Sequence, residues 1–246
     1  MSFSVIVPTT RPDLLPRALR SIADQRVPPG EVLVLHDGGP PLDLGAWPFP
    51  LRSYGIMPRL GPALARNVLA ATAREDRLAF LDDDDVWLPD HLARLGGADA
   101  AGLAFTDAWL HHDVEGWTRL FAFRFTPELL RRTNPIILST VGLGRAAFWQ
   151  VGGFDASLAR YEAWDLFLRL QAGGTRLQRI AGPDVHYHYS RRSLTADDAA
   201  MAQAFSAFCQ RHGLLLGRKS FASMLDDPEL QAVRLEGAGG AATETE

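Results

Sequence analysis

The amino-acid sequence predicts an α/β fold in which helices flank a mostly parallel sheet. The first observation is that short apolar runs alternate with helical patterns along the first part of the chain, the order typical of a parallel sheet. The second is that polar residues follow the predicted strands. The third is that 246 residues, 47% of them apolar and 22% charged, are typical of a globular domain.

The first part of the chain contains five strongly predicted elements. They follow one another as strand, helix, strand, helix and strand: residues 4–7, 11–25, 31–35, 61–75 and 77–81. Pro8 ends the first strand, and a weaker strand is predicted near 51–56. Consecutive strands joined by helices predict parallel pairing with a helix layer on each face.

The second part of the chain is less regular. Strands are expected at 101–112, 118–125 and 175–190, and helices at 126–132, 161–174 and 195–213. Thr126 is the expected N-cap of one helix, with Pro127 at its first position. We predict one domain made of two subdomains, residues 1–110 and 111–215, followed by a partly disordered C-terminal extension, 216–246.

The charge and the cysteine content exclude several classes of protein. The net charge is −4, which gives no basic surface for nucleic acid. Cys209 is the single cysteine, so no intrachain disulfide can form. The N-terminus does not resemble a signal peptide, and no apolar run has the length of a transmembrane segment. We therefore expect a cytoplasmic protein.

Polar residues follow three predicted strands that would meet at one edge of the sheet. They are Thr9, Asp37 and the run Asp82 to Asp85. Ligands of open α/β sheets bind beyond the carboxyl ends of the strands. Neighbouring aspartates in an extended chain point to opposite sides, and Mg²⁺ and Mn²⁺ use one or two carboxylates together with substrate phosphates. The run therefore predicts a site for a metal and a diphosphate; the alternative is a solvated acidic turn with one aspartate capping the next helix.

Four segments, taken together and in this order along the chain, resemble the SpsA-like, family-two GT-A nucleotide-sugar glycosyltransferases. They are "SVIVPTTRPDLLPRALRSI", "EVLVLHDGG", "GPALARNVLAATA" and "AFLDDDDVWLPDHL". The resemblance is close over residues 3–110 and looser up to "HYHYSRRSLT". It implies a GT-A (Rossmann-like) sheet with a smaller acceptor-side sheet. It also implies transfer of a sugar from a UDP, dTDP or GDP sugar to an unknown hydroxyl, with inversion and with Mn²⁺ or Mg²⁺.

The resemblance also implies a role for individual residues. The nucleotide would be bound by Pro8, Thr9, Arg11, Asp37, Arg66, Asn67 and Asp83. Asp82 and Asp84 would bind the metal, and His188 would bind the metal or contact the diphosphate unless its role is structural. Arg191 and Arg192 would neutralise the diphosphate.

This chain lacks the residue that the family pattern assigns as the catalytic base. Relatives carry Glu-Asp-x-Asp at the start of a helix and use the second residue as the base, whereas this chain has Glu162-Ala163-Trp164-Asp165. Glu162 or Asp165 could replace it, since they lie one helical turn apart. Both could equally be acids that stabilise a helix N-terminus.

Three other functions compete with transfer. With Ala163 at the base position, the protein could bind sugar nucleotides without efficient transfer. A haloacid-dehalogenase-like phosphatase would use Asp82 as nucleophile and Asp84 as acid–base, but the only lysine, Lys219, lies near the C-terminus. A sugar-1-phosphate nucleotidyltransferase would need a Gly-rich phosphate loop, which "PTTRPDLLP" lacks.

Overall fold

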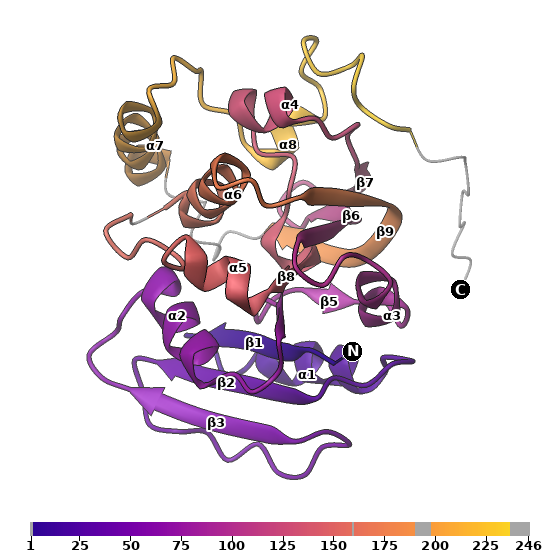
Figure 1. Ribbon diagram of the computed structural model, residues 1–246, viewed down its shortest axis with the longest axis vertical. Coiled ribbons are helices and arrows are strands. Elements are labelled where there is room, and N and C mark those ends of the chain that lie inside the picture. Colours follow the sequence, from indigo (N-terminus) through magenta and orange to yellow (C-terminus); the bar gives the residue numbers. More distant parts are fainter. Residues whose placement is uncertain (1, 159, 190–197, 237–246) are drawn as a thin grey trace.

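The predicted α/β fold class is confirmed by the computed structural model, which describes residues 2–158, 160–189 and 198–236 (Figure 1). The strands of these residues form one curled sheet with the strand order β3-β2-β1-β4-β8-β6-β9-β5, and β7 pairs with β6. Helices cover the sheet on both faces. A single sheet therefore joins the regular first half of the chain to the less regular second half.

The first half forms a parallel βα arrangement, as the sequence predicts. Its elements are β1 (Ser4–Thr9), α1 (Leu15–Ala23), β2 (Glu31–Asp37), β3 (Leu51–Ile56), α2 (Pro62–Thr72) and β4 (Arg77–Phe80). β1 pairs in parallel with β2 on one side and β4 on the other. Val5 and Val7 pack in the same cluster as α1, and Ile6 packs with α2. The carboxyl ends of β1, β2 and β4 consequently meet at one edge.

The second half adds antiparallel strands and returns the chain to the same edge. Its elements are β5 (Val86–Trp87), α3 (His91–Gly96), β6 (Leu103–His112), β7 (Trp117–Phe121), α4 (Pro127–Arg132), the 3₁₀ turn η1 (Leu138–Thr140), β8 (Val141–Gly144), α5 (Arg145–Gln150), α6 (Glu162–Ala172), β9 (Leu177–Tyr189), α7 (Asp198–His212) and α8 (Phe221–Met224). β8 lies antiparallel between β4 and β6. The subdomain boundary predicted at residue 110 stays a prediction, and it falls inside β6.

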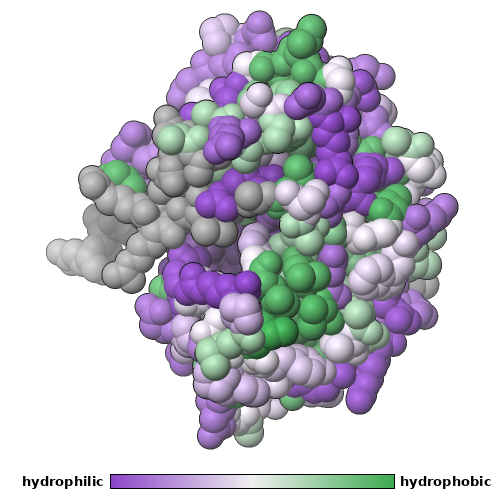
Figure 2. All heavy atoms as spheres, turned by 90° about the vertical axis from the view of Figure 1, so that its left-hand side faces the viewer, coloured by the Kyte–Doolittle hydropathy of each residue, from purple (hydrophilic) through white to green (hydrophobic). Residues whose placement is uncertain are grey.

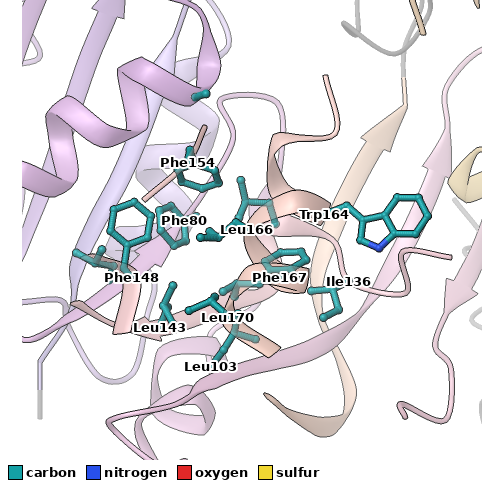
Figure 3. Packing of buried hydrophobic residues seen from close by; sticks show 14 of the residues in the cluster. Phe80, Leu103, Ile136, Leu143, Phe148, Phe154, Trp164, Leu166, Phe167 and Leu170 are labelled. Atoms are coloured by element: carbon teal, nitrogen blue, oxygen red, sulfur yellow. The ribbon is translucent and has the colours of Figure 1, made fainter. Parts of the chain in front are cut away.

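One aromatic cluster joins the two halves (Figure 3). The ring centroids of Phe80 and Phe154 lie 5.5 Å apart, and those of Phe148 and Phe154 also lie 5.5 Å apart. In Figure 3, Trp164 projects away from this group, and its indole N–H donates to the carbonyl of Leu130 at 2.7 Å. This packing anchors α6 between the sheet and α4, and so fixes where the first turn of α6 lies.

The C-terminal extension packs onto the domain as far as it is described. Met224, Leu225 and Leu230 are buried in the same apolar cluster as α1. The backbone of Phe123 forms an isolated antiparallel bridge with Arg234. Residues 237–246, where disorder was expected, lie outside the described residues. Part of the extension is therefore an element of the fold.

The face of the molecule in Figure 2 is mostly hydrophilic, with one compact apolar area below its centre. Six large apolar side chains are exposed in the described part of the chain: Val27, Met57, Leu64, Val114, Trp149 and Leu215. Within the same residues, no helix combines the length and apolar character that crossing a membrane requires.

Candidate active site

A cavity of about 510 Å³ lies beyond the carboxyl ends of β1, β2 and β4, within the usual size range of ligand sites. Most of the residues singled out in the sequence line it: Pro8, Thr9, Arg11, Asp37, Arg66, Asp82, Asp83, Asp84, Glu162 and His188. Asn67 and Asp165 do not line it. Arg191 and Arg192 lie outside the described residues.

The end of β1 is tied to the acidic turn by Asp83. The hydroxyl of Thr9 donates to Asp83 Oδ2 at 2.7 Å, and one guanidinium nitrogen of Arg11 donates to Asp83 Oδ1 at 2.5 Å. Burial raises the pKa of Asp83, and the contacts with Thr9 and Arg11 oppose that rise. These contacts place the first strand end, the predicted nucleotide side, directly against the aspartates.

Asp37 at the end of β2 organises the loop that leads into α2. Its two carboxylate oxygens accept the backbone N–H groups of Leu60 at 2.6 Å and Gly61 at 2.9 Å. Gly61 has φ +84°, a conformation that favours glycine. Each carboxylate oxygen has a second lone pair, so Asp37 retains acceptor capacity toward the cavity that it lines.

Arg66 on α2 connects the acidic turn to the first turn of α6. One of its guanidinium nitrogens donates to Asp82 at 2.6 Å, and another donates to Glu162 at 3.0 Å. The Arg66 side chain is only 7% exposed. A buried guanidinium thus holds the predicted metal side and the predicted base side of the cavity together.

The last two aspartates of the turn have different surroundings. Asp84 Oδ2 accepts a bond from Arg11 at 2.8 Å, and burial together with the charge of Asp82 raises the pKa of Asp84 to about 6. Asp85 is fully buried, and it accepts bonds from the Ser139 hydroxyl at 2.5 Å and the His188 backbone N–H at 3.0 Å. Asp84 therefore faces the cavity, while Asp85 anchors the turn to the rest of the domain.

The carboxylates of the turn fit a divalent cation that also uses ligand phosphates. Among the described residues, no three His, Cys, Asp or Glu side chains form a complete metal site, so Asp82, Asp84 and His188 are not one by themselves. Mg²⁺ and Mn²⁺ commonly use one or two protein carboxylates. The proximity of Asp82, which contributes to the raised pKa of Asp84, marks a repulsion that a cation would relieve.

His188 lines the cavity, but its imidazole has protein partners. Its Nδ1 lies 3.2 Å from Asp113 Oδ1, and its ring stacks on that of His111 with centroids 4.6 Å apart. Burial lowers the pKa of His188. Its metal or diphosphate role stays a prediction.

Asn67 and Asp165 have contacts that stabilise the fold. The side-chain nitrogen of Asn67 donates to the backbone carbonyl of Phe154 at 2.7 Å. Its side-chain oxygen accepts a hydrogen bond from the backbone N–H of Phe154 at 2.9 Å. Asp165 is fully buried, and its carboxylate binds Arg169 Nε at 2.8 Å and His212 Nε2 at 2.9 Å. These contacts commit both side chains to the packing of neighbouring segments.

The start of α6 presents Glu162 and Ala163 to the cavity. Tyr161, the residue before the helix, has φ +62° and ψ +14°, a left-handed conformation that costs a non-glycine residue about 1–2 kcal/mol. The packing of Trp164 and the bond from Arg66 to Glu162 hold the helix in place after this sharp entry. Glu162 is therefore the carboxylate of α6 that lines the cavity.

The opposite end of the cavity is built by residues that the sequence did not identify. They are the segment from Gly217 to Ala222, Met224, the end of α4 with Arg132, and the following residues 133–138. The Thr133 hydroxyl lies 3.2 Å from the sulfur of Met224, which joins two of these segments. The only sequence signal was a basic pair, Arg218 and Lys219, beside Phe221.

Comparison with known sequences identifies glycosyltransferases as relatives. The chain is 28% identical over 247 residues to "Uncharacterized glycosyltransferase YwdF" of Bacillus subtilis, covering 94% of this chain and 92% of that one. It is 24% identical over 210 residues to an uncharacterized glycosyltransferase of Haemophilus influenzae, covering 79% of this chain and 71% of that one. A shorter match, 34% identical over 105 residues, covers 36% of this chain and 31% of the succinoglycan biosynthesis protein ExoW of Rhizobium meliloti. No protein-family model matches the chain.

Comparison with solved structures identifies the same fold. TarS 1–349 of S. aureus in complex with UDP-GlcNAc has a TM-score of 0.62 at 16% identity, covering 85% of this chain and 67% of TarS 1–349. Uncomplexed TarS 1–349 has a TM-score of 0.59 at 19% identity, covering 76% of this chain, which spans 60% of that one. The mannosyltransferase PcManGT of Pyrobaculum calidifontis, in complex with GDP-Man and Mn²⁺, has a TM-score of 0.60 at 18% identity, covering 89% of this chain and 65% of PcManGT.

The two comparisons agree with each other, because both identify glycosyltransferases. The narrower SpsA-like, family-two assignment stays a prediction. By sequence over nearly its whole length the chain is similar to a glycosyltransferase, and its fold is similar to that of TarS and PcManGT.

Proposed function

We propose that the protein transfers a sugar from a nucleoside diphosphate sugar to a hydroxyl acceptor, with inversion and with the help of Mn²⁺ or Mg²⁺. The observation that carries the proposal is that one cavity contains both the acidic turn, Asp82 to Asp84, and the carboxylate of Glu162. The complexes of TarS with UDP-GlcNAc and of PcManGT with GDP-Man and Mn²⁺ support this class of donor. We infer the SpsA-like, family-two type from the sequence segments alone.

In this proposal the edge of β1, β2 and β4 binds the nucleotide. Asp37, which already holds the loop at Leu60 and Gly61, accepts an N–H of the base. Thr9 and Asp83, which are bonded to each other, lie at the ribose. Pro8 borders the base. These groups orient the donor so that its diphosphate reaches Asp82 and Asp84.

The carboxylates of Asp82 and Asp84 would hold the divalent cation. That cation stabilises the negative charge that develops on the departing diphosphate. Arg11 and Arg66 line the same part of the cavity, and they provide further positive charge there. His188, which also lines the cavity, remains a candidate contact for the diphosphate.

Glu162 is the base in this proposal. It lines the cavity, and its carboxylate accepts a hydrogen bond from Arg66 at 3.0 Å, a contact that holds the side chain in position. An ionised carboxylate can accept the proton of an acceptor hydroxyl as the new bond to the sugar forms. Asp165 is not carried into the proposal, because Arg169 and His212 occupy its buried carboxylate.

A protein that binds sugar nucleotides without efficient transfer is the second candidate. The observation that favours it is that Ala163, which also lines the cavity, has no carboxylate at the position where the family-two pattern places the base. The variant Ala163→Asp separates the two functions. If the wild type lacks a working base, this variant gains transfer activity; if Glu162 is the base, Ala163→Asp changes the rate little.

The test combines binding with turnover. Thermal-shift screening against UDP, dTDP, GDP and their sugars, with and without Mn²⁺, identifies the donor. A ligand present at about 100 times its dissociation constant stabilises the fold by about 2.7 kcal/mol. Hydrolysis or transfer from the stabilising sugar nucleotide is then measured. Release of phosphate from p-nitrophenyl phosphate, without any response to sugar nucleotides, would instead indicate a phosphatase.

A further inference from the structure

Arg11 occupies the acidic turn in the manner of a bound cation. A single guanidinium nitrogen donates to Asp83 at 2.5 Å and to Asp84 at 2.8 Å, so one positive group bridges two neighbouring carboxylates. Its other terminal nitrogen, Nη1, is buried and has no hydrogen-bond partner among the described residues. The turn is thus partly neutralised by the chain's own arginine.

Arg66 neutralises the other side of the turn, but its surroundings differ. It pairs with Asp82 and Glu162, its side chain is 7% exposed, and it lies on the regular helix α2. The Arg11 side chain is 24% exposed and belongs to the link between β1 and α1. Arg11 is therefore the arginine that can leave the carboxylates without the rearrangement of a helix.

A divalent cation at Asp84 conflicts with Arg11 in its present position. Two positive groups on one carboxylate repel each other, and Asp84 is largely buried, so water screens that repulsion poorly. If Arg11 moves away, its guanidinium needs a new anionic partner in the cavity. A nucleoside diphosphate bound at this edge supplies phosphate oxygens, which guanidinium groups bind well.

We propose that Arg11 is a built-in counter-cation of Asp84 that gives up this carboxylate to a divalent metal when a nucleoside diphosphate binds. The inference rests on the proposed function, because it assigns Arg11 a task at the same donor site. It makes metal uptake conditional on the nucleotide. By thermodynamic linkage, the nucleotide then raises metal affinity by the same factor by which the metal raises nucleotide affinity.

The test measures Mn²⁺ affinity from the electron paramagnetic resonance signal of free Mn²⁺, with no reliance on turnover. For the wild type, UDP or GDP should raise the affinity for Mn²⁺ by about tenfold or more. Arg11→Gln should bind Mn²⁺ alone about tenfold more tightly than the wild type and should lose most of the effect of the nucleotide. Arg11→Lys keeps the charge near the turn and should remain close to the wild type.

Arg17→Gln is the matched control. Arg17 donates to the backbone carbonyl of Asp84 rather than to a carboxylate, so its removal changes the local charge by the same amount without freeing an acid. Equal tightening of Mn²⁺ binding by Arg17→Gln would overturn the inference, as would an unchanged affinity in Arg11→Gln. Circular dichroism establishes that each variant is folded before titration, and Arg11→Met serves if Arg11→Gln does not fold.

Failure of this inference can be told apart from failure of the proposed function. Nucleotide binding is measured separately, by thermal shift in metal-free and Mn²⁺-containing buffer. If the protein binds UDP or GDP but its Mn²⁺ affinity does not change when residue 11 is substituted, the counter-cation role alone is refuted. A protein that binds none of the nucleotides in either buffer refutes the donor site and the counter-cation role together.

Discussion

The two ends of the cavity differ in what brings their residues together. At the first end, Thr9 and Asp37 are the last residues of β1 and β2 and the aspartates follow β4, and the parallel pairing of β1 with both other strands brings them together. The second end is assembled from the end of α4 with the residues after it, the segment Gly217 to Ala222 and Met224. The first end is a consequence of strand order; the second depends on packing between distant segments.

The difference also appears in the contacts. The first end is polar and ion-paired, with Arg11 and Arg66 each bridging two acids. The second end combines apolar side chains such as Phe221 and Met224 with basic side chains such as Arg132. In the proposed function, the first end would hold the donor diphosphate together with its cation, and an acceptor would pack at the second.

The largest expected effect is at the first end. Asp84→Asn should lower transfer by roughly 10³-fold, because an amide cannot hold a divalent cation at the leaving diphosphate as a carboxylate does. Asp90→Asn is the matched control, since Asp90 pairs with Arg26 at the exposed surface just after the turn. Steady-state rates with the identified donor give the measurement. Equal rates for Asp84→Asn and the wild type would remove the acidic turn from the mechanism.

The next effect tests stability rather than chemistry. Asp165→Asn should lower the free energy of unfolding by about 3 kcal/mol, because it leaves Arg169 and His212 without the buried carboxylate that binds them. Asp76→Asn, at a carboxylate that is 99% exposed, should change it little. Urea denaturation measures both. A stable Asp165→Asn variant with greatly reduced turnover would instead give Asp165 the role of the base.

Glu162→Gln should lower transfer by roughly 10²-fold while nucleotide binding persists, because the amide cannot take the proton of the acceptor hydroxyl. The measurement compares the rate of transfer with nucleotide affinity in the same preparation. This result would place the base at the junction between the two ends of the cavity. An unaffected rate would move the base elsewhere and strengthen the binding-only alternative.

The smallest effect concerns His91, away from both ends. Burial, with a contribution from Arg94, lowers the pKa of His91 from 6.5 to about 3. Between these values the unfolded chain binds a proton that the folded chain does not, so stability falls as the pH decreases. At about pH 5 the loss is about 2 kcal/mol relative to neutral pH. His91→Gln should show a flatter dependence of unfolding free energy on pH, and parallel curves for the two proteins would contradict it.

The strands and most helices could be predicted because their signals are local. The apolar run before Asp82 predicts a buried strand that ends at an acidic turn, and β4 and the turn follow in that order. Thr126 was expected to cap a helix, and its hydroxyl accepts the N–H of Leu129 at 3.1 Å. The strand expected at 118–125 ends earlier, at Phe121, because Phe123 instead bridges to Arg234 of the C-terminal extension.

The contacts of the individual site residues depend on the tertiary structure and could not be predicted. Asn67 and Asp165 carry polar groups in a suggestive sequence context, but both point into packing contacts. The left-handed conformation of Tyr161, which sets the entry into α6, has no local signal because the residue is not glycine. The contribution of residues 217–222 to the cavity likewise depends on how the extension folds back.

The sequence by itself determined the parallel first half of the sheet and the collection of polar residues at its edge, because hydrophobic periodicity and strand order act over short distances. The tertiary structure decided which arginine is paired with which carboxylate. Arg11 meets Asp84 across 73 residues and Arg66 meets Glu162 across 96, and such pairing follows from the packing of whole elements. Ion pairing in a buried corner depends on position in space, and no local pattern of residues specifies it.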